Sequence, residues 1–187
     1  MIDFSAWYDR GHPYDAFLEK FATDEQKRRW SELHSKVSLS SDQKNLLRSF
    51  RREMKVLVVA GAWCGDCVNQ CPIFSHFVAE NNRIGIRFFD RDESAELAAE
   101  LAICGAPRVP SLLFLSEDGF PCGRAGDRTL SKYRDLTAGM DGASCPTGLV
   151  APGKSLLDNV VQDWLDEFER IQLMLRTSGR LRTKHGD

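Results

Sequence analysis

The stretch VLVVAGAWCGDCVNQCP, residues 56–72, constrains the fold more than any other part of the chain. It begins with the continuous apolar run Val56–Ala60, whose β-branched residues predict a short strand buried on both faces. Two cysteines, Cys64 and Cys67, follow a turn of small residues, and the pattern there predicts a helix over about 65–80. We therefore expect the cysteine pair at the N-terminus of a helix that directly follows a buried strand.

The remaining apolar pattern alternates between strands and helices. It predicts strands over 84–89, 111–115 and 120–124 and helices over 94–103, 130–136 and 157–175. The last helix has the strongest amphipathic pattern, and we expect it to pack on the domain. Upstream, the capping boxes Thr23-x-x-Gln26 and Ser40-x-x-Gln43 predict helix starts in an aromatic-rich segment that also packs on the core. This order of elements predicts an α/β fold with a mixed sheet.

Length and charge limit the number of domains and the kinds of partner. A chain of 187 residues suits one domain with extensions. We expect a helical N-terminal extension over 1–39, the α/β domain over 40–138, and a loop plus the long helix over 139–187. A net charge of −2 gives no general attraction to nucleic acid or to anionic membranes. The short basic tail Arg180–Lys184 is interpreted as a solvated end.

The expected cellular location determines whether the cysteines are reduced thiols or disulfides. The first residues lack the apolar core of a signal peptide, and no apolar run approaches the ~20 residues of a membrane span. The sequence therefore predicts a cytoplasmic protein, whose six cysteines are mainly reduced thiols. A close C-x-x-C pair in such a compartment indicates either redox chemistry or metal binding.

The spacing of Cys64 and Cys67 suits disulfide exchange. At a helix N-terminus, unpaired backbone N–H groups and the helix dipole favour a thiolate on Cys64. The thiolate is the nucleophile in exchange, so Cys64 is expected to attack a substrate disulfide. Cys67, one helical turn later and more buried, is close enough to resolve the mixed disulfide by forming a Cys64–Cys67 disulfide.

Other residues support this interpretation. Trp63 precedes the pair, and Pro72 follows it inside the predicted helix. Val109-Pro110 lies at the entrance of the third strand, where an X-Pro bond can be cis and can leave backbone groups free to pair with a substrate chain.

These residues, with the turn at Gly119 and the later Gly126, resemble the thioredoxin family over about residues 40–137. The resemblance implies a thioredoxin fold, in which helices flank a mixed central sheet, and here the helical N- and C-terminal extensions lie outside the match. It also implies that Cys64 is the nucleophile, that Cys67 resolves, and that Pro110 is cis. The substrate groove that it implies is formed by Trp63, Gly65, Val109, Pro110 and Gly126.

The chain departs from the family pattern at two positions. Asp66 stands where common thioredoxins have proline, and its carboxylate opposes a thiolate on Cys64 by roughly half a pKa unit. We expect Asp66 to give a less acidic thiol and to influence substrate choice; alternatively, it only favours the helix N-terminus. Val58 replaces a buried aspartate that assists proton transfer. Arg108 is interpreted as a solvated arginine at the groove, with pairing to Asp66 or to the Cys64 thiolate as the alternative.

The other thiols leave two further alternatives open. Cys71 shares a helix face with Cys67, so Cys64, Cys67 and Cys71 could hold a metal or an iron–sulfur cluster, although no further ligand is close in sequence. We expect Cys71 to be a small buried thiol, with a regulatory role as the alternative. Cys104 and Cys122 are expected to pack, and Cys145 to be exposed.

The sequence thus predicts a thiol–disulfide oxidoreductase that uses no metal or organic cofactor. It would reduce protein or small-molecule disulfides and would need an upstream reductase. The alternative is a thioredoxin-fold binding or scaffold module with weak or no redox turnover. Neither the oligomeric state nor the physiological substrate follows from the sequence.

Overall fold

The computed structural model describes residues 2–138 and 155–187. In chain order the elements are α1 (Phe4–Arg10), α2 (Tyr14–Phe21), α3 (Asp24–Lys36), α4 (Ser41–Arg48), β1 (Met54–Ala60), α5 (Gly65–Glu80), β2 (Ile84–Asp90), α6 (Ala95–Glu100), β3 (Ser111–Ser116), β4 (Pro121–Gly126), α7 (Leu130–Thr137), α8 (Leu156–Thr177) and α9 (Gly179–His185). The predicted strands and the helix that follows the cysteine pair are confirmed, as are both N-terminal capping boxes.

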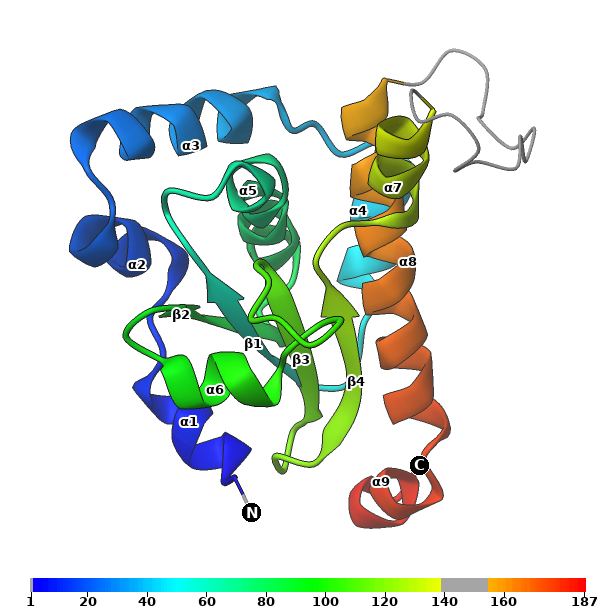
Figure 1. The fold of residues 1–187 in the computed structure, drawn as a ribbon. Coiled ribbons are helices and arrows are strands. Elements are labelled where there is room, and N and C mark those ends of the chain that lie inside the picture. Colours follow the sequence, from blue (N-terminus) through cyan, green and yellow to red (C-terminus); the bar gives the residue numbers. More distant parts are fainter. Residues whose placement is uncertain (1, 139–154) are drawn as a thin grey trace.

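The four strands form one mixed sheet in the order β2-β1-β3-β4, which Figure 1 shows at the centre of the molecule. β1 pairs in parallel with β2 and antiparallel with β3, and β3 continues antiparallel into β4. The β3–β4 hairpin turns at Gly119, whose φ of 85° lies in the left-handed region that glycine adopts without strain. The predicted mixed α/β sheet is confirmed.

Helices α5 and α8 cover one face of the sheet. Phe168 of α8 is fully buried, and its ring lies 5.8, 5.2 and 5.1 Å from the rings of Phe74, Phe77 and Phe114, respectively. Phe74 and Phe77 belong to α5, while Phe114 belongs to β3, so one side chain joins three elements. The amphipathic C-terminal helix therefore packs on the domain, as its sequence pattern predicts.

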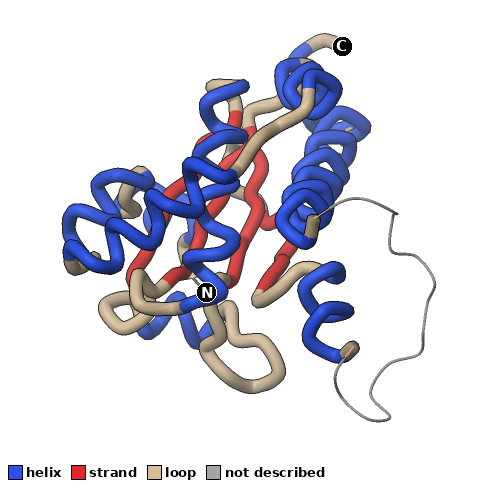
Figure 2. The backbone as a smooth tube through the Cα atoms, turned by 90° about the horizontal axis from the view of Figure 1, so that it is seen from above, coloured by secondary structure: helices blue, strands red, loops and turns tan. Residues whose placement is uncertain are grey.

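The N-terminal helices belong to the same hydrophobic core. Phe17 of α2 and Trp30 of α3 are fully buried, and both pack in one cluster with residues of the sheet. Phe17 contacts Phe88 of β2, with ring centroids 5.5 Å apart. Figure 2, seen from above, shows helices on both sides of the strands. The expectation that the N-terminal segment packs on the core is confirmed.

Helix α6 is shorter than the predicted helix over 94–103. Beyond it the backbones of Ile103 and Ala106 exchange hydrogen bonds of 2.9 and 3.2 Å across a tight turn. Cys104 and Gly105 form this turn with φ values of 51° and 73°, which no right-handed helix accommodates. Cys104, which we expected to pack, is exposed there.

The basic tail is also more ordered than its sequence suggests. It forms the short helix α9, in which Leu181 is buried and the Arg180 guanidinium pairs with Asp118. Arg180, Arg182, Thr183 and Lys184 are nevertheless exposed, as the prediction of a solvated end requires, and only Leu181 departs from it. The predicted loop over 139–153, with Cys145, lies outside the described residues. Among the residues that are described, no helix combines the length and apolarity needed to cross a membrane.

Candidate functional site

The predicted site residues lie at one end of the sheet, where β1 and β4 end and β3 begins. β1 ends just before the turn to Cys64, β3 begins just after Pro110, and β4 ends at Gly126. The register pairs Val59 of β1 with Ser111 of β3, and Ser111 in turn with Gly126. Segments that are distant in the sequence therefore form a single surface.

Cys64 is the N-cap residue of α5 and is only partly buried. Its thiol donates a hydrogen bond of 3.6 Å to the carbonyl oxygen of Val109. The Val109–Pro110 peptide bond is cis, the geometry that the sequence predicts. The sulfur thus lies at a helix N-terminus and faces the backbone of the proline segment.

Cys67 lies one turn into α5 and is fully buried. Its sulfur accepts a hydrogen bond of 3.5 Å from the backbone N–H of Gly61, and burial raises its pKa. The pKa of Cys64 is also raised, first by the hydrogen bond with Cys67 and then by burial, while the backbone N–H groups of Cys67 and Asp66 act in the opposite direction. Both residues are free thiols in this structure. The helix N-terminus favours the thiolate, but the paired, partly buried setting outweighs that effect.

The other predicted groove residues are the sequence neighbours of Cys64 and a glycine of β4 that contacts the proline segment. Trp63 is 44% exposed, and the guanidinium of Arg91 lies 4.4 Å from the centroid of its ring. A side chain at Gly126, where φ is 122°, would place its Cβ 2.4 Å from the carbonyl oxygen of Pro110. Only glycine permits this approach of β4 to the proline segment. Gly65 is exposed, and a Cβ added there would have no neighbouring atom within 4 Å.

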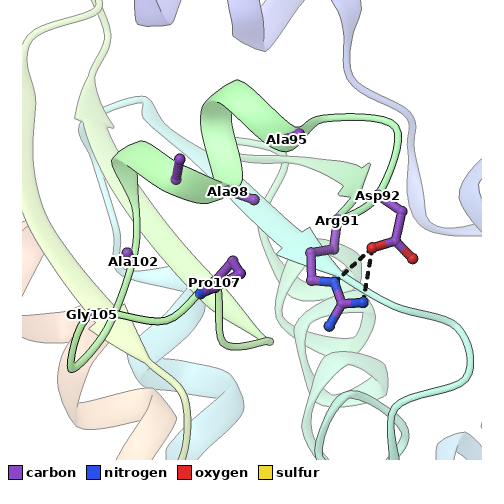
Figure 3. Close-up of a pocket in the computed structure, with 8 residues that line it drawn as sticks. Arg91, Asp92, Ala95, Ala98, Ala102, Gly105 and Pro107 are labelled. Carbon is purple, nitrogen blue, oxygen red and sulfur yellow. Dashed lines mark hydrogen bonds and ion pairs between the residues drawn. The ribbon is translucent and has the colours of Figure 1, made fainter.

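A shallow pocket lies between Arg91, α6 and the segment that follows α6 (Figure 3). Its volume is about 410 Å³, and its floor consists of small side chains from α6 and the segment after it, including Ala98, Ala102 and Pro107. Arg91 forms one edge, where its guanidinium pairs with Asp92 at 2.8 Å. Because Arg91 also covers the Trp63 ring, the pocket and the cysteine site share a border.

A charged cluster includes Asp66, which lies two residues after Cys64. The carboxylate of Asp66 pairs with Arg128 at 2.6 Å, and Arg128 also contacts Asp127 at 3.4 Å. Arg108 pairs with Asp127 at 3.1 Å, so the predicted alternative of a pair with Asp66 is not formed. The physical reason is that Asp127 directly follows Gly126, which pairs with Ser111 next to Pro110, so the sheet register brings this carboxylate to Arg108. The expected influence of Asp66 on substrate choice remains a prediction.

Asp127 itself is buried and ionised. Burial acts to raise its pKa, but hydrogen bonds from Tyr133 and Arg108 outweigh that effect, and the pKa is lowered. Sequence reasoning did not identify Asp127, Arg128 or Tyr133, because their charges and hydroxyl stand at no diagnostic spacing from the cysteines. The only local signal was their position just after Gly126.

Cys71, Cys104 and Cys122, the other cysteines that the structure describes, do not extend the pair into a larger site. Cys71 is fully buried one turn beyond Cys67, which confirms the expected buried thiol, and Cys122 is partly buried. Across residues 2–138 and 155–187, no three His, Cys, Asp or Glu side chains are grouped as a metal ion would require. Cys64, Cys67 and Cys71 do not form such a group.

Replacing Arg128 by methionine should slow the alkylation of Cys64. The unpaired Asp66 carboxylate would then oppose the thiolate and raise the pKa of Cys64 further. Below that pKa the thiolate fraction rises tenfold per pH unit, so the rate increases with pH in both proteins and the variant curve moves to higher pH. A shift of roughly half a unit slows alkylation about threefold at a fixed pH. Iodoacetamide labelling from pH 6 to 9, read by peptide mass spectrometry, measures this rate.

Arg108→Met is the matched control, because Arg108 contacts Asp127 but leaves the Asp66–Arg128 pair intact. Its alkylation profile should overlay that of the wild type. Equal slowing in the two variants would contradict a specific effect of the Asp66–Arg128 pair.

Comparison with known proteins agrees with this geometry. The sequence model of the thioredoxin family matches residues 11–130. The chain belongs to this family. The match includes α2 and α3, which our sequence analysis had placed outside the resemblance, so the thioredoxin-family region begins well before β1. None of the curated proteins compared with the chain matches it.

Two solved structures share the fold of this chain over nearly its whole length. A protein of unknown function from Pseudomonas aeruginosa is 19% identical, with a TM-score of 0.70. The match covers 91% of this chain and 97% of that one. An HIV epitope scaffold is 16% identical, with the same TM-score and the same coverage. Mitochondrial thioredoxin 3 from Saccharomyces cerevisiae is 21% identical, with a TM-score of 0.34. Its match covers 50% of this chain and 86% of the thioredoxin chain.

Proposed function

We propose that this thioredoxin-family protein is a thiol–disulfide oxidoreductase that reduces disulfides of proteins or small molecules through Cys64 and Cys67. The observation that carries the proposal is the placement of the two thiols. Cys64 is partly exposed at the start of α5 and faces the Val109 carbonyl, while Cys67 is buried one turn behind it. An accessible thiol backed by a sheltered one suits attack followed by resolution.

In the proposed reaction, the Cys64 thiolate attacks one sulfur of a substrate disulfide. A mixed disulfide forms, and the first substrate sulfur leaves as a thiolate that takes up a proton. Cys67, once deprotonated, attacks the Cys64 sulfur and releases the second substrate thiol. Two electrons pass to the substrate, and the protein is left with a Cys64–Cys67 disulfide. An external dithiol reductant, which we place in the cytoplasm with its reductase, restores the two thiols.

The direction of transfer follows from the raised pKa of Cys64. Strong oxidants of this kind hold a stabilised thiolate, which favours their reduced form and lets them pass a disulfide onward. A thiol whose pKa is raised lacks that stabilisation, so the disulfide form is comparatively favoured and the dithiol donates electrons. We therefore assign the protein as a reductant.

The test is the reduction potential of the pair, measured by equilibration in defined dithiol–disulfide buffers with the protein thiols counted by mass spectrometry. We expect a value nearer the about −270 mV of thioredoxin than the about −120 mV of a strong oxidant. The same protein should accelerate the reduction of insulin disulfides by dithiothreitol. A potential above about −180 mV would contradict the assignment as a reductant.

A further inference from the structure

Two buried tryptophans on the terminal helices reach the segment that carries the cysteines. Trp30 lies on α3 and Trp164 on α8, and both are at most 2% exposed. Each indole N–H donates to a group of the cysteine segment: Trp30 to the carbonyl oxygen of Ala62 at 2.9 Å, and Trp164 to Oε1 of Gln70 at 3.1 Å. Figure 1 shows α3 and α8 on two sides of α5.

The bond from Trp30 holds the turn that presents Cys64. Ala62 lies two residues before Cys64 and is 1% exposed, so its carbonyl has no access to bulk water. Within the same turn, the backbone N–H of Cys64 donates to the carbonyl oxygen of Gly61 at 3.0 Å. An indole that fixes the Ala62 carbonyl therefore fixes the direction from which the chain enters α5, and with it the position of the Cys64 sulfur.

The bond from Trp164 acts through a buried glutamine. Gln70 is 1% exposed, and its amide nitrogen donates to the carbonyl oxygens of Asp66 at 3.2 Å and Asp127 at 2.9 Å. Its amide oxygen is occupied by the Trp164 indole N–H. Gln70 thus joins the first turn of α5 to Asp127. The residue before Asp127, Gly126, lies against the carbonyl oxygen of Pro110. Because the indole N–H of Trp164 can only donate, the amide of Gln70 must turn its oxygen toward Trp164. Its nitrogen is then directed to the carbonyl oxygens of Asp66 and Asp127.

We propose that Trp30 and Trp164 are positioning residues, through which the terminal helices hold Cys64, Cys67 and the proline segment in the arrangement needed for exchange. This inference rests on the proposed redox function. Neither indole touches the reacting sulfurs. Each acts by fixing a backbone or amide group next to them, and a displacement of about 1 Å between reacting atoms slows a reaction by up to about 100-fold.

The test replaces each tryptophan by phenylalanine, which keeps an aromatic ring and removes the N–H donor. Trp7→Phe is the matched control, because Trp7 also packs on an aromatic ring, that of Phe89 at 5.7 Å, but its indole donates no hydrogen bond to the described part of the chain. All proteins carry serine at Cys104, Cys122 and Cys145, so that only the site thiols react with solvent reagents. Circular dichroism and urea unfolding verify that each variant is folded.

The first readout is closure of the Cys64–Cys67 disulfide after reaction with 5,5′-dithiobis(2-nitrobenzoate). Cys64 forms a mixed disulfide with one thionitrobenzoate and displaces the other into solution. Attack of Cys67 on the Cys64 sulfur then releases the bound thionitrobenzoate. Each released thionitrobenzoate absorbs at 412 nm. We expect Trp30→Phe and Trp164→Phe to slow the second release about tenfold and Trp7→Phe to leave it unchanged. The second readout is the reduction potential. A tenfold lower equilibrium constant for forming the Cys64–Cys67 disulfide raises the reduction potential by about 30 mV. Reduced global stability alone would not cause this change.

Where Trp30→Phe fails to fold, Gln70→Met takes its place beside Trp164→Phe. Because these two changes break one chain of bonds, the double variant should be no slower than the slower single variant. Equal closure rates and potentials in the Trp7, Trp30 and Trp164 variants would overturn the positioning role. A wild type that releases a single thionitrobenzoate and forms no Cys64–Cys67 disulfide would contradict the proposed function instead.

Discussion

Replacing Cys64 by serine should reduce the rate of insulin-disulfide reduction to that of dithiothreitol alone. A serine hydroxyl does not ionise in the neutral range and forms no disulfide, so the first covalent step is lost outright. Replacing Cys67 by serine should have a different result. Attack by Cys64 would still occur, but no second thiol would resolve the product, and the substrate would remain bound through a mixed disulfide. Turbidity measures the first effect, and intact mass spectrometry under non-reducing conditions measures the second.

Cys71→Ala is the control for both variants, because Cys71 lies one helical turn beyond Cys67 and is as fully buried as Cys67. It should retain the activity of the wild type and trap no substrate. Full activity in the Cys64 variant would contradict the mechanism. A folded Cys67 variant that never accumulates a mixed disulfide would show that another group resolves the intermediate, and Cys71 would then be the first residue to examine.

The elements that carry the cysteine pair could be predicted because their signals are local. A continuous β-branched run, a turn of small residues and a helix pattern follow one another within residues 56–80, and β1 and α5 form there. The cysteines are thus at a helix N-terminus whatever the rest of the chain does. The same locality explains why the capping boxes of α3 and α4 were predicted: each bond joins residues three positions apart.

The partners of the site could not be predicted, because they are brought together by the sheet register and by helix packing. Arg128 lies far from Asp66 in sequence, and Trp164 lies still farther from Gln70, yet each pair is in direct contact. No spacing rule connects such residues. The alternative pair between Arg108 and Asp66 is not formed for the same reason, since the fold brings Arg108 into contact with Asp127, 19 positions later in the sequence.

Replacing Phe168 by alanine should lower the free energy of unfolding by about 3–5 kcal/mol, the usual cost of removing a fully buried phenylalanine side chain. Its ring fills the space between α8, α5 and β3, where it contacts Phe74, Phe77 and Phe114 edge-on or tilted. Urea unfolding followed by tryptophan fluorescence and circular dichroism measures the change in midpoint.

Leu173→Ala on the same helix is the control, because Leu173 is 55% exposed and its replacement should change stability by no more than about 0.5 kcal/mol. Equal stability of the two variants would contradict the packing of α8 described above. The denaturant slope carries a further consequence. If α8 unfolds together with the sheet, the Phe168 variant keeps the slope of the wild type and shifts only its midpoint. If α8 separates first, the slope falls and Trp164 leaves Gln70 before the core opens, so exchange activity would be lost at urea concentrations where the sheet is still folded.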